Sequence, residues 1–229
     1  MSLRLRYRRG AMKRALLTTA AVVLLGAVAV AVALLTTRAG DRRLTPFPAA
    51  AVITDPIPAQ TQRRHANTWP LYGYNLARTR YNPASMLHPP YAEKWRLSVG
   101  KLLEFPPAVA GKRLYFNSGN GILHCVRAET GELLWRRNMP GKSASSPTVS
   151  GRVVYDVSMG GFCRAYDRVT GKQLWSFEMG GPSEASPLVW KNLVIFGSWD
   201  SNVYALAKDT GKPVWVFHTG NRVHSSPAV

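Results

Sequence analysis

The chain has 229 residues, with 30 Lys and Arg against 12 Asp and Glu, and a formal net charge of +18. Residues 1–68 hold 11 of the basic residues against Asp41 and Asp55, so half of the net charge, +9, precedes the rest of the chain. The other half is spread over predicted loops without clustered Lys, Arg and aromatic residues, which excludes a nucleic-acid-binding surface. Two explanations of this basic surface stay open: attraction to anionic headgroups or acidic polymers, and simple solvation without a specific partner.

The N-terminal part has the pattern of a membrane anchor. Residues 1–14 form a basic segment that contains six Lys and Arg, and residues 15–37 carry no charge. An uncharged apolar run of this length predicts a transmembrane helix. The positive-inside rule places residues 1–14 in the cytoplasm and everything after the helix outside it, as in a single-pass protein of the plasma membrane. A cleaved signal peptide is the alternative, but we favour an uncleaved anchor because the run exceeds the usual signal core.

Residues 38–68 connect this anchor to the rest of the chain. Four prolines lie among small and polar residues in this stretch, and the stretch has no apolar period. Proline-rich segments of this kind are extended spacers, so we expect a linker that holds the following domain away from the membrane. The alternative is that part of the linker packs along that domain.

A repeat of 40 residues organises the chain from residue 69 to residue 229. Four tryptophans keep this spacing, as do three Thr-Gly pairs and four prolines: Trp95, Trp135, Trp175, Trp215; Thr130-Gly131, Thr170-Gly171, Thr210-Gly211; Pro107, Pro147, Pro187, Pro227. The last three prolines lie within Ser-Ser-Pro or Ala-Ser-Pro. A sustained period of this length predicts a solenoid or a propeller.

Each repeat contains four short runs of β-branched and aromatic residues bounded by Gly, Asn or Asp, which is typical of strands joined by hairpins. We align Asn120-Gly121, Gly160-Gly161 and Ser201-Asn202 as one tight turn that needs positive φ. No helical spacing of apolar residues competes with this assignment. The fold class is therefore all-β, a β-propeller of four-stranded antiparallel blades. The blades span about 104–140, 144–180 and 184–220, and residues 224–229 begin another.

The repeats resemble the tryptophan-docking motif of pyrroloquinoline-quinone-type (PQQ-like) propellers. The segment 165–175, Ala-Tyr-Asp-Arg-Val-Thr-Gly-Lys-Gln-Leu-Trp, carries the motif most completely. The first repeat has Cys125 and Arg127 at the Ala and Asp positions, and the third has Ala207 in place of Asp. The resemblance implies that each indole packs between neighbouring blades, and that these residues have docking roles: Trp95, Trp135, Trp175, Trp215, Gly131, Gly171, Gly211 and Asp167.

A second resemblance concerns the segment before the repeats. Trp69, Tyr72-Gly73, Arg80 and Asn82-Pro83 are similar to the segment that leads into the propeller of quinoprotein dehydrogenases. Residues 91–99 look like the last strand of a blade whose other strands are missing from this sequence. Three complete blades do not close a ring, since propellers have four to eight. We therefore interpret the sequence as a fragment of a longer polypeptide, with ring closure by self-association as the alternative.

Single side chains with chemical potential are few. Cys125 and Cys163 lie on equivalent strands, two residues short of one full repeat apart. The even offset makes both point the same way around the ring, which predicts two buried free thiols and no disulfide. Asp156 and Asp200 are interpreted as turn residues at strand ends. The five histidines show no metal-ligand spacing, and no nucleophile or phosphate-binding motif occurs. We predict no catalytic residue and no metal ligand.

The segments that lead into the first strand of each blade differ from one another, whereas the packing residues are uniform. In the family, ligands bind where these segments meet, at the mouth of the central channel. Variation within a uniform repeat favours a role in specificity. The sequence therefore predicts a polar channel mouth lined by Glu104, Lys142, Glu184, Arg222 and His224. The alternative is that these are solvated loop residues.

Two functions fit these observations. The first is a non-enzymatic, membrane-tethered propeller without a cofactor that binds envelope proteins or polymers, resembling the propeller scaffold of outer-membrane protein assembly. The second is part of a quinoprotein dehydrogenase that oxidises an alcohol or a sugar with bound PQQ and Ca²⁺. We favour the first because the docking motifs are degenerate and the vicinal Cys-Cys pair of many quinoprotein dehydrogenases is missing. Fold resemblance alone does not decide between them.

Overall fold

A computed structural model describes residues 68–85 and 89–229 of the chain. The predicted basic segment 1–14, the predicted transmembrane helix 15–37 and nearly all of the predicted linker 38–68 lie outside these residues. Within the described part, no helix has the length and apolar character needed to cross a bilayer.

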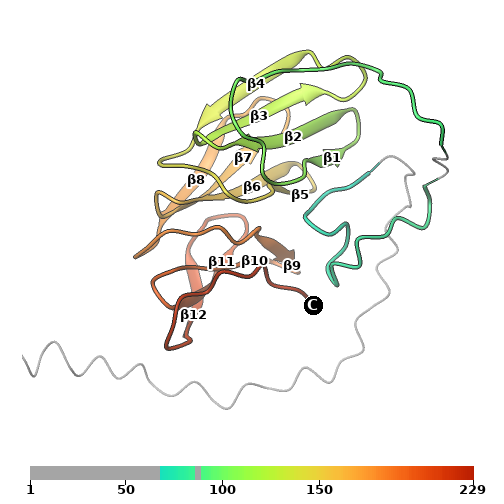
Figure 1. Ribbon diagram of the computed structural model, residues 1–229. Coiled ribbons are helices and arrows are strands. Elements are labelled where there is room, and N and C mark those ends of the chain that lie inside the picture. Colours follow the sequence, from blue (N-terminus) through green and yellow to red (C-terminus); the bar gives the residue numbers. More distant parts are fainter. Residues whose placement is uncertain (1–67, 86–88) are drawn as a thin grey trace, which may run out of the picture. The chain divides into compact units, whose positions relative to one another are not determined.

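The described residues form three four-stranded antiparallel sheets, which confirms the all-β prediction and is consistent with propeller blades (Figure 1). Each sheet is a simple meander in which neighbouring strands follow one another in the chain. We call the sheets blades 1, 2 and 3. Their strands are β1 (Ala108–Ala110), β2 (Arg113–Ser118), β3 (Ile122–Arg127) and β4 (Leu133–Asn138); β5 (Thr148–Ser150), β6 (Val153–Ser158), β7 (Phe162–Asp167) and β8 (Gln173–Glu178); and β9 (Leu188–Trp190), β10 (Leu193–Gly197), β11 (Asn202–Ala207) and β12 (Pro213–His218).

The tight turn between the second and third strands of each blade has one residue with positive φ. This residue is Gly121 (φ 82°) in blade 1, Gly161 (φ 81°) in blade 2 and Ser201 (φ 70°) in blade 3. The expected alignment of Ser201-Asn202 with the two glycine turns is therefore wrong by one residue. Asn202 is the first residue of β11, and the aligned pair is Asp200-Ser201.

Trp95, Trp135 and Trp175 each pack against the repeat that follows. Trp215 is partly exposed and makes no such contact among the described residues. The indole N–H of Trp95, Trp135 and Trp175 donates to a backbone carbonyl 33 residues further on, at 3.0, 3.2 and 2.8 Å. A Cβ built on Gly131, Gly171 or Gly211 would lie only 2.5–2.7 Å from the corresponding indole ring. These glycines are therefore required both for their positive φ and for the close approach of the tryptophan.

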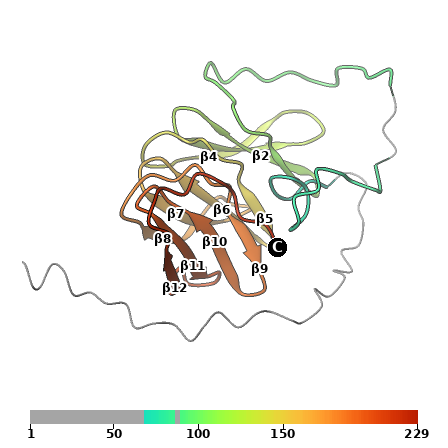
Figure 2. The ribbon, with the colours of Figure 1, turned by 60° about the horizontal axis from the view of Figure 1, so that its bottom comes forward.

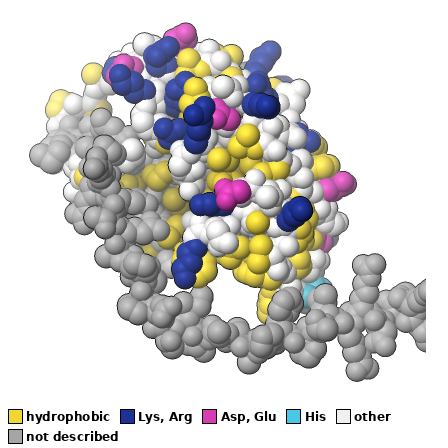
Figure 3. All heavy atoms as spheres, turned by 180° about the vertical axis from the view of Figure 1, so that it is seen from behind, with side chains coloured by type: hydrophobic (Ala, Val, Ile, Leu, Met, Phe, Trp, Pro, Cys, Tyr) yellow, Lys and Arg dark blue, Asp and Glu magenta, His cyan; other side chains and the backbone are white. Residues whose placement is uncertain are grey.

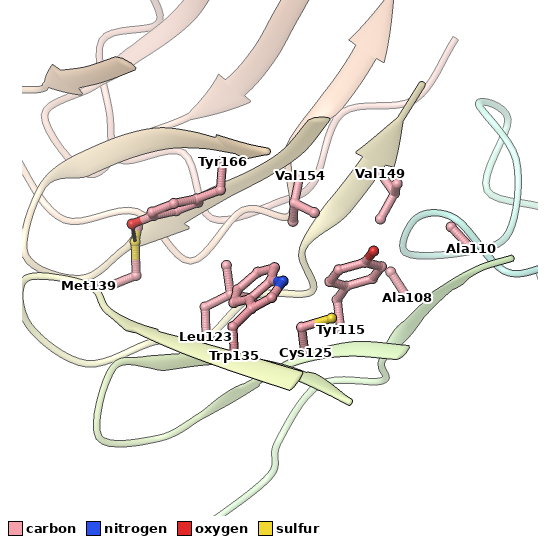
Figure 4. Packing of buried hydrophobic residues seen from close by; sticks show 10 residues of the cluster. All are labelled: Ala108, Ala110, Tyr115, Leu123, Cys125, Trp135, Met139, Val149, Val154 and Tyr166. Carbon is pink, nitrogen blue, oxygen red and sulfur yellow. Dashed lines mark hydrogen bonds between the residues drawn. The ribbon is translucent and has the colours of Figure 1, made fainter. Parts of the chain in front are cut away.

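A second aromatic residue supports each docked indole. The Tyr115 hydroxyl donates to the carbonyl oxygen of Arg168 at 3.1 Å, the same oxygen that accepts from Trp135. Tyr155 and Trp175 share the Lys208 carbonyl oxygen in the same way. Figure 4 shows Tyr115 and Trp135 of blade 1 lying toward Val149 and Val154 of blade 2 across the junction. Each blade junction is thus an apolar core with polar tips that are satisfied by hydrogen bonds.

Residues 91–99 do not form a regular strand, yet Trp95 docks on Gly131 as the tryptophans of complete blades do. Beside it lies an apolar groove of about 460 Å³ on the face of blade 1 that does not pack on blade 2. The residues that line it include Leu97, Leu103, Leu114 and Phe116. Residues 91–99 therefore occupy the place of a last blade strand, but no strand of the described part pairs with them.

The cysteines are free and fully buried, which confirms the prediction from their spacing. Cys125 packs in the cluster between blades 1 and 2, and Cys163 packs in the cluster between blades 2 and 3. The two thiols therefore point in the same direction around the array, each into a different junction.

The expectation for Asp156 is wrong, whereas that for Asp200 is right. Asp156 lies inside β6 and is fully buried, so it is not a turn residue. Asp200 lies in the turn between β10 and β11, where its carboxylate accepts hydrogen bonds from Gly180 N at 2.9 Å and from the Tyr204 hydroxyl at 2.5 Å.

The fit between indole and glycine yields a testable prediction on Gly171. We expect Gly171→Ala to lower the free energy of unfolding by about 2 kcal/mol more than Gly151→Ala. Both glycines have positive φ, but a Cβ on Gly171 would lie 2.7 Å from Trp135, whereas a Cβ on Gly151 meets nothing within 4 Å. Urea denaturation of the two variants measures the difference. Equal losses would show that backbone strain accounts for the whole effect and that the contact with the indole adds nothing to it.

Candidate functional site

The candidate site is a cavity of about 570 Å³ at the inner ends of the blades. Three of the five predicted residues line it: Glu104, Glu184 and His224. These residues occupy the same repeat position, which in blade 2 is Ala144. The other lining residues are Tyr72, Arg78, Arg80, Phe105, Ser225, Ser226 and Ala228. The repeat therefore brings polar side chains that are 40, 80 or 120 residues apart in the chain to one place.

The strongest polar contact in the cavity joins two repeats. His224 Nδ1 lies 2.5 Å from Glu184 Oε1, and both side chains remain partly exposed. The His224 ring also packs against Trp199, with the ring centroids 5.0 Å apart. The carboxylate and the indole together hold the imidazole in a defined orientation. The hydrogen bonds among the described residues involve Nδ1 of His224 and leave Nε2 available.

Arg222 and Lys142 do not line this cavity. The Arg222 guanidinium lies over the Trp199 ring, 5.3 Å from its centroid, so it reaches the site only through the indole. Lys142 contributes its backbone carbonyl, which accepts from Met159 N at 2.9 Å, and its side chain is exposed. The sequence favours an ordinary strand aromatic at Trp199, but Trp199 lies in the turn between β10 and β11, where it contacts His224. Its departure from the 40-residue period, where the other repeats have Gly119 and Met159, was the available signal.

The floor of the cavity is formed by residues 69–80, which we call the strap. The strap lies across β1 of blade 1 and β5 of blade 2 and then reaches the last residue of the chain. Trp69 pairs with Val109 of β1, and the Pro70 carbonyl accepts from Val149 N of β5 at 2.7 Å. The Leu76 carbonyl accepts from Val229 N at 3.0 Å. In both ribbon views the C-terminal end lies near β5 and β9 (Figures 1 and 2).

Arg78 fixes the strap to blade 3 and to the residues that follow it. Its guanidinium donates to the carbonyl oxygens of Ser186 at 3.0 Å, Pro227 at 2.8 Å and Tyr72 at 2.5 Å. No carboxylate pairs with it among the described residues, and desolvation by burial lowers the pKa of Arg78 to about 10. Gly73 makes room for this arrangement, because a Cβ there would lie 2.9 Å from the Arg78 Cα.

The strap was only partly visible in the sequence. Tyr72, Gly73 and Arg80 belonged to the segment that resembles the start of quinoprotein propellers, but Arg78 carried no signal of its own. Both arginines lie over the Tyr72 ring, with guanidinium carbons 5.3 and 5.4 Å from its centroid. Arg80 is exposed and donates to the Tyr72 hydroxyl at 2.7 Å. Its guanidinium lines the cavity and has further N–H groups that can donate to a ligand.

Hydrogen bonds between serines of neighbouring repeats connect the segments before the innermost strands. They give a reason for the serine that precedes each of the last three repeated prolines. Ser146 N donates to Ser186 Oγ and Ser186 N donates to Ser226 Oγ, both at 2.9 Å and both 40 residues apart. The Ser146 hydroxyl in turn donates to the Pro106 carbonyl at 2.8 Å. The serine before each proline therefore links one innermost segment to the next, which keeps the cavity residues in register.

The chemistry of the cavity is that of recognition by hydrogen bonds and charge. It presents two carboxylates, an imidazole, two guanidiniums and the hydroxyls of Ser225 and Ser226. In the part of the chain that the structure describes, no group of three or more His, Cys, Asp or Glu side chains is placed to hold a metal ion.

The family described as outer membrane protein assembly factor BamB matches residues 88–228. The chain belongs to this PQQ-like propeller repeat family. None of the curated proteins compared with the chain matches it.

Solved structures show the same fold at low sequence identity. The chain is similar to a europium-containing methanol dehydrogenase with 21% identity and a TM-score of 0.60, over 68% of this chain and 32% of that one. It is similar to BamB from Moraxella catarrhalis with 23% identity and a TM-score of 0.50, over 55% of this chain and 39% of that one. A computationally designed protein, Ika4, has 17% identity and a TM-score of 0.54, over 59% and 85%. The chain thus spans about a third of the natural propellers that it resembles.

The role of Arg78 in holding the strap is testable by substitution. We expect Arg78→Ala to lower the free energy of unfolding by about 3 kcal/mol, because three partly buried carbonyl oxygens lose charged donors. Arg80→Ala is the matched control on the same segment, with an expected loss of about 0.5 kcal/mol or less. Urea denaturation and the rate of proteolysis within residues 69–80 report both effects. Equal stability of the two variants would contradict the role given to Arg78.

Proposed function

We propose that this protein is a non-catalytic binding module: a membrane-tethered, extracytoplasmic propeller that holds envelope proteins or polymers at its channel mouth. The observation that carries the proposal is the convergence of Glu104, Glu184 and His224 on one cavity. Their repeat position varies in residue type, whereas the docking tryptophans and glycines are constant from blade to blade. Variation at one place on a constant scaffold is expected of a recognition site.

The form and chemistry of the cavity favour an extended polar ligand, such as a segment of a protein partner. The cavity is open and offers side chains of both signs, with Glu104 and Arg80 exposed and able to form further contacts. A partner peptide presents backbone donors and acceptors together with charged side chains, which suits this mixture. The family description, an outer membrane protein assembly factor, adds support for a protein partner in the envelope.

The charge of the outer surface gives no support to a second, purely electrostatic function. Figure 3 shows Lys and Arg side chains scattered over one face, with Asp and Glu side chains among them. Such a surface attracts anionic lipids or polymers only weakly at physiological salt, because exposed charges are screened beyond about 8 Å. Envelope polymers therefore enter the proposal as alternative ligands of the channel mouth.

The tether and the location belong to the proposal as well. The uncharged run 15–37 and its flanking arginines support a single-pass anchor in the plasma membrane with a cytoplasmic N-terminus. The proline-rich residues 38–68 would then hold the propeller at a distance from the bilayer surface. A quinoprotein dehydrogenase remains only as an outcome of the test, since its support is likeness of fold and of the segment that leads into the propeller.

Site-specific photo-cross-linking in the native membrane tests the proposal. We expect a cross-linking residue in place of Glu104 to capture one defined partner, and one in place of Leu133, an exposed residue of β4, to capture none. In the chain that carries the cross-linking residue at position 104, Glu184→Gln should reduce the yield of cross-linked partner about tenfold. The reason is that a lost charged hydrogen bond is worth about 1.4 kcal/mol. Indistinguishable cross-links from Glu104 and Leu133 would contradict the binding site. A quinone that co-purifies with the chain would contradict the proposal that the protein is not an enzyme.

A further inference from the structure

A buried polar pair lies inside the junction of blades 1 and 2, apart from the channel mouth. Asp156 on β6 is 0% exposed and Asn117 on β2 is 6% exposed. The Asn117 amide donates one N–H to Asp156 Oδ1 at 2.8 Å and the other to the Ser145 carbonyl oxygen at 3.0 Å. Both donors of the amide are thus used, and the pair links β2 of blade 1 to β6 of blade 2.

Two oxygen atoms of this pair have no hydrogen-bond partner. They are Asn117 Oδ1 and Asp156 Oδ2, and both are fully buried. If Asp156 is ionised, both atoms are acceptors, so neither can satisfy the other. A buried acceptor without a partner costs about 1–3 kcal/mol, and more when it is charged. A single proton on Asp156 Oδ2 would turn one of the two acceptors into a donor, so that one O–H···O hydrogen bond would satisfy both atoms.

We propose that Asp156 is a carboxylic acid in the folded protein and donates its Oδ2–H to Asn117 Oδ1. Together with the bond from Asn117 Nδ2 to Asp156 Oδ1, this closes a ring of two hydrogen bonds between an acid and an amide. Blades 1 and 2 are then joined by a latch that depends on one proton. Loss of the proton leaves a buried anion facing an amide oxygen, and the junction loosens.

The repeat itself does not require this pair. The position of Asp156 is occupied by Phe116 in blade 1 and by Phe196 in blade 3, and both are buried apolar side chains. The position of Asn117 is occupied by Val157 and Gly197. Neither member of the pair is thus needed to build a blade. The polar pair occurs together at one junction, which is expected if its two members serve each other.

The β7 strand carries the charged and titratable groups nearest to Asp156. Arg164 is its register partner, but the Arg164 guanidinium donates to Ser176 Oγ at 3.2 Å and to the Asn138 carbonyl at 3.3 Å. Tyr166 points its hydroxyl at Met139 Sδ, and Cys163 packs in the next junction. No cation pairs with the Asp156 carboxyl group among the described residues, so an ionised form would be uncompensated.

On β4 of blade 1, Arg137 reaches across the same junction, but its guanidinium donates to the carbonyl oxygens of Gly171 at 2.7 Å and Thr170 at 3.1 Å. The remaining elements around Asp156 contribute no charge. The segment before β5 presents the hydroxyls of Ser143 and Ser145, and Ser145 Oγ donates to Asp156 Oδ1 at 3.4 Å. On β3, His124 hydrogen-bonds with Ser118 and stacks on Phe116, so it takes no part in the pair. β5 carries no titratable side chain. The groups that touch the Asp156 carboxyl are therefore polar and uncharged.

Burial raises the pKa of Asp156, which favours the protonated form that the proposal requires. Desolvation raises the pKa of Asp156 to about 7, although hydrogen bonds from Asn117, Val157 N and Ser145 oppose the shift. A carboxyl group whose pKa is higher in the folded state stabilises the fold fully below its unfolded pKa of about 4. That contribution is lost as the pH rises to about 7 and through it. The junction should thus be tighter in acid than in alkali.

Substitution of Asp156 by Asn tests the latch, because the amide keeps the shape and both hydrogen bonds of the acid without a proton to lose. We expect the folding constant of the wild-type full chain to fall by roughly a thousandfold relative to Asp156→Asn between pH 4 and pH 9. Urea denaturation across this range measures the ratio. Asp209→Asn, at an exposed turn carboxylate, is the matched control and should leave the wild-type profile unchanged.

Infrared spectroscopy provides a second measurement that does not depend on unfolding. We expect the folded chain at pH 5.5 to show a protonated carboxyl band that is absent from Asp156→Asn and present in Asp209→Asn. A wild-type pH profile that parallels that of Asp156→Asn would overturn the proposal. So would the absence of the band at pH 5.5, which would mean that water or another ligand satisfies an ionised Asp156.

Discussion

The contact between an indole and a glycine of the next blade is the constraint on which the structure depends. Each docked tryptophan buries an apolar surface worth on the order of 4–6 kcal/mol before entropy costs, and its N–H donates to a carbonyl of the following repeat. The glycine beneath it is the only residue that combines positive φ with room for the ring. Because the contact recurs every 40 residues, it sets the relative placement of the blades and brings their inner ends together.

The fold could be predicted because its determinants are local or periodic. Trp135, Trp175 and the Thr-Gly turns recur at a constant spacing, and each performs the same task wherever it occurs. The parity of the two cysteines predicted their free state by the same logic. The turn at Ser201 was misaligned by one residue, since the left-handed position in blade 3 lacks the glycine that marks it in the other blades.

The candidate site and the buried polar pair depend on contacts between residues that do not follow the 40-residue repeat. Three of the five predicted channel residues converge on the cavity, but Arg222 meets it only through Trp199 and Lys142 lies elsewhere. The role of Arg78 could not be predicted, since three backbone carbonyls, two of them from distant segments, define it. Asp156 was misread because its partner, Asn117, lies 39 residues away on another blade. Such pairs become visible only after the blades are docked.

A double-mutant cycle between Trp135 and Gly171 tests the central claim most directly. If the indole sets the junction, the added Cβ of Gly171→Ala harms the fold mainly by displacing the ring, so its extra cost should disappear in the Trp135→Ala background. We predict a coupling free energy of about 1–2 kcal/mol from urea denaturation of the four chains. Additive losses, with coupling below about 0.5 kcal/mol, would contradict the claim that this contact sets the arrangement of the blades.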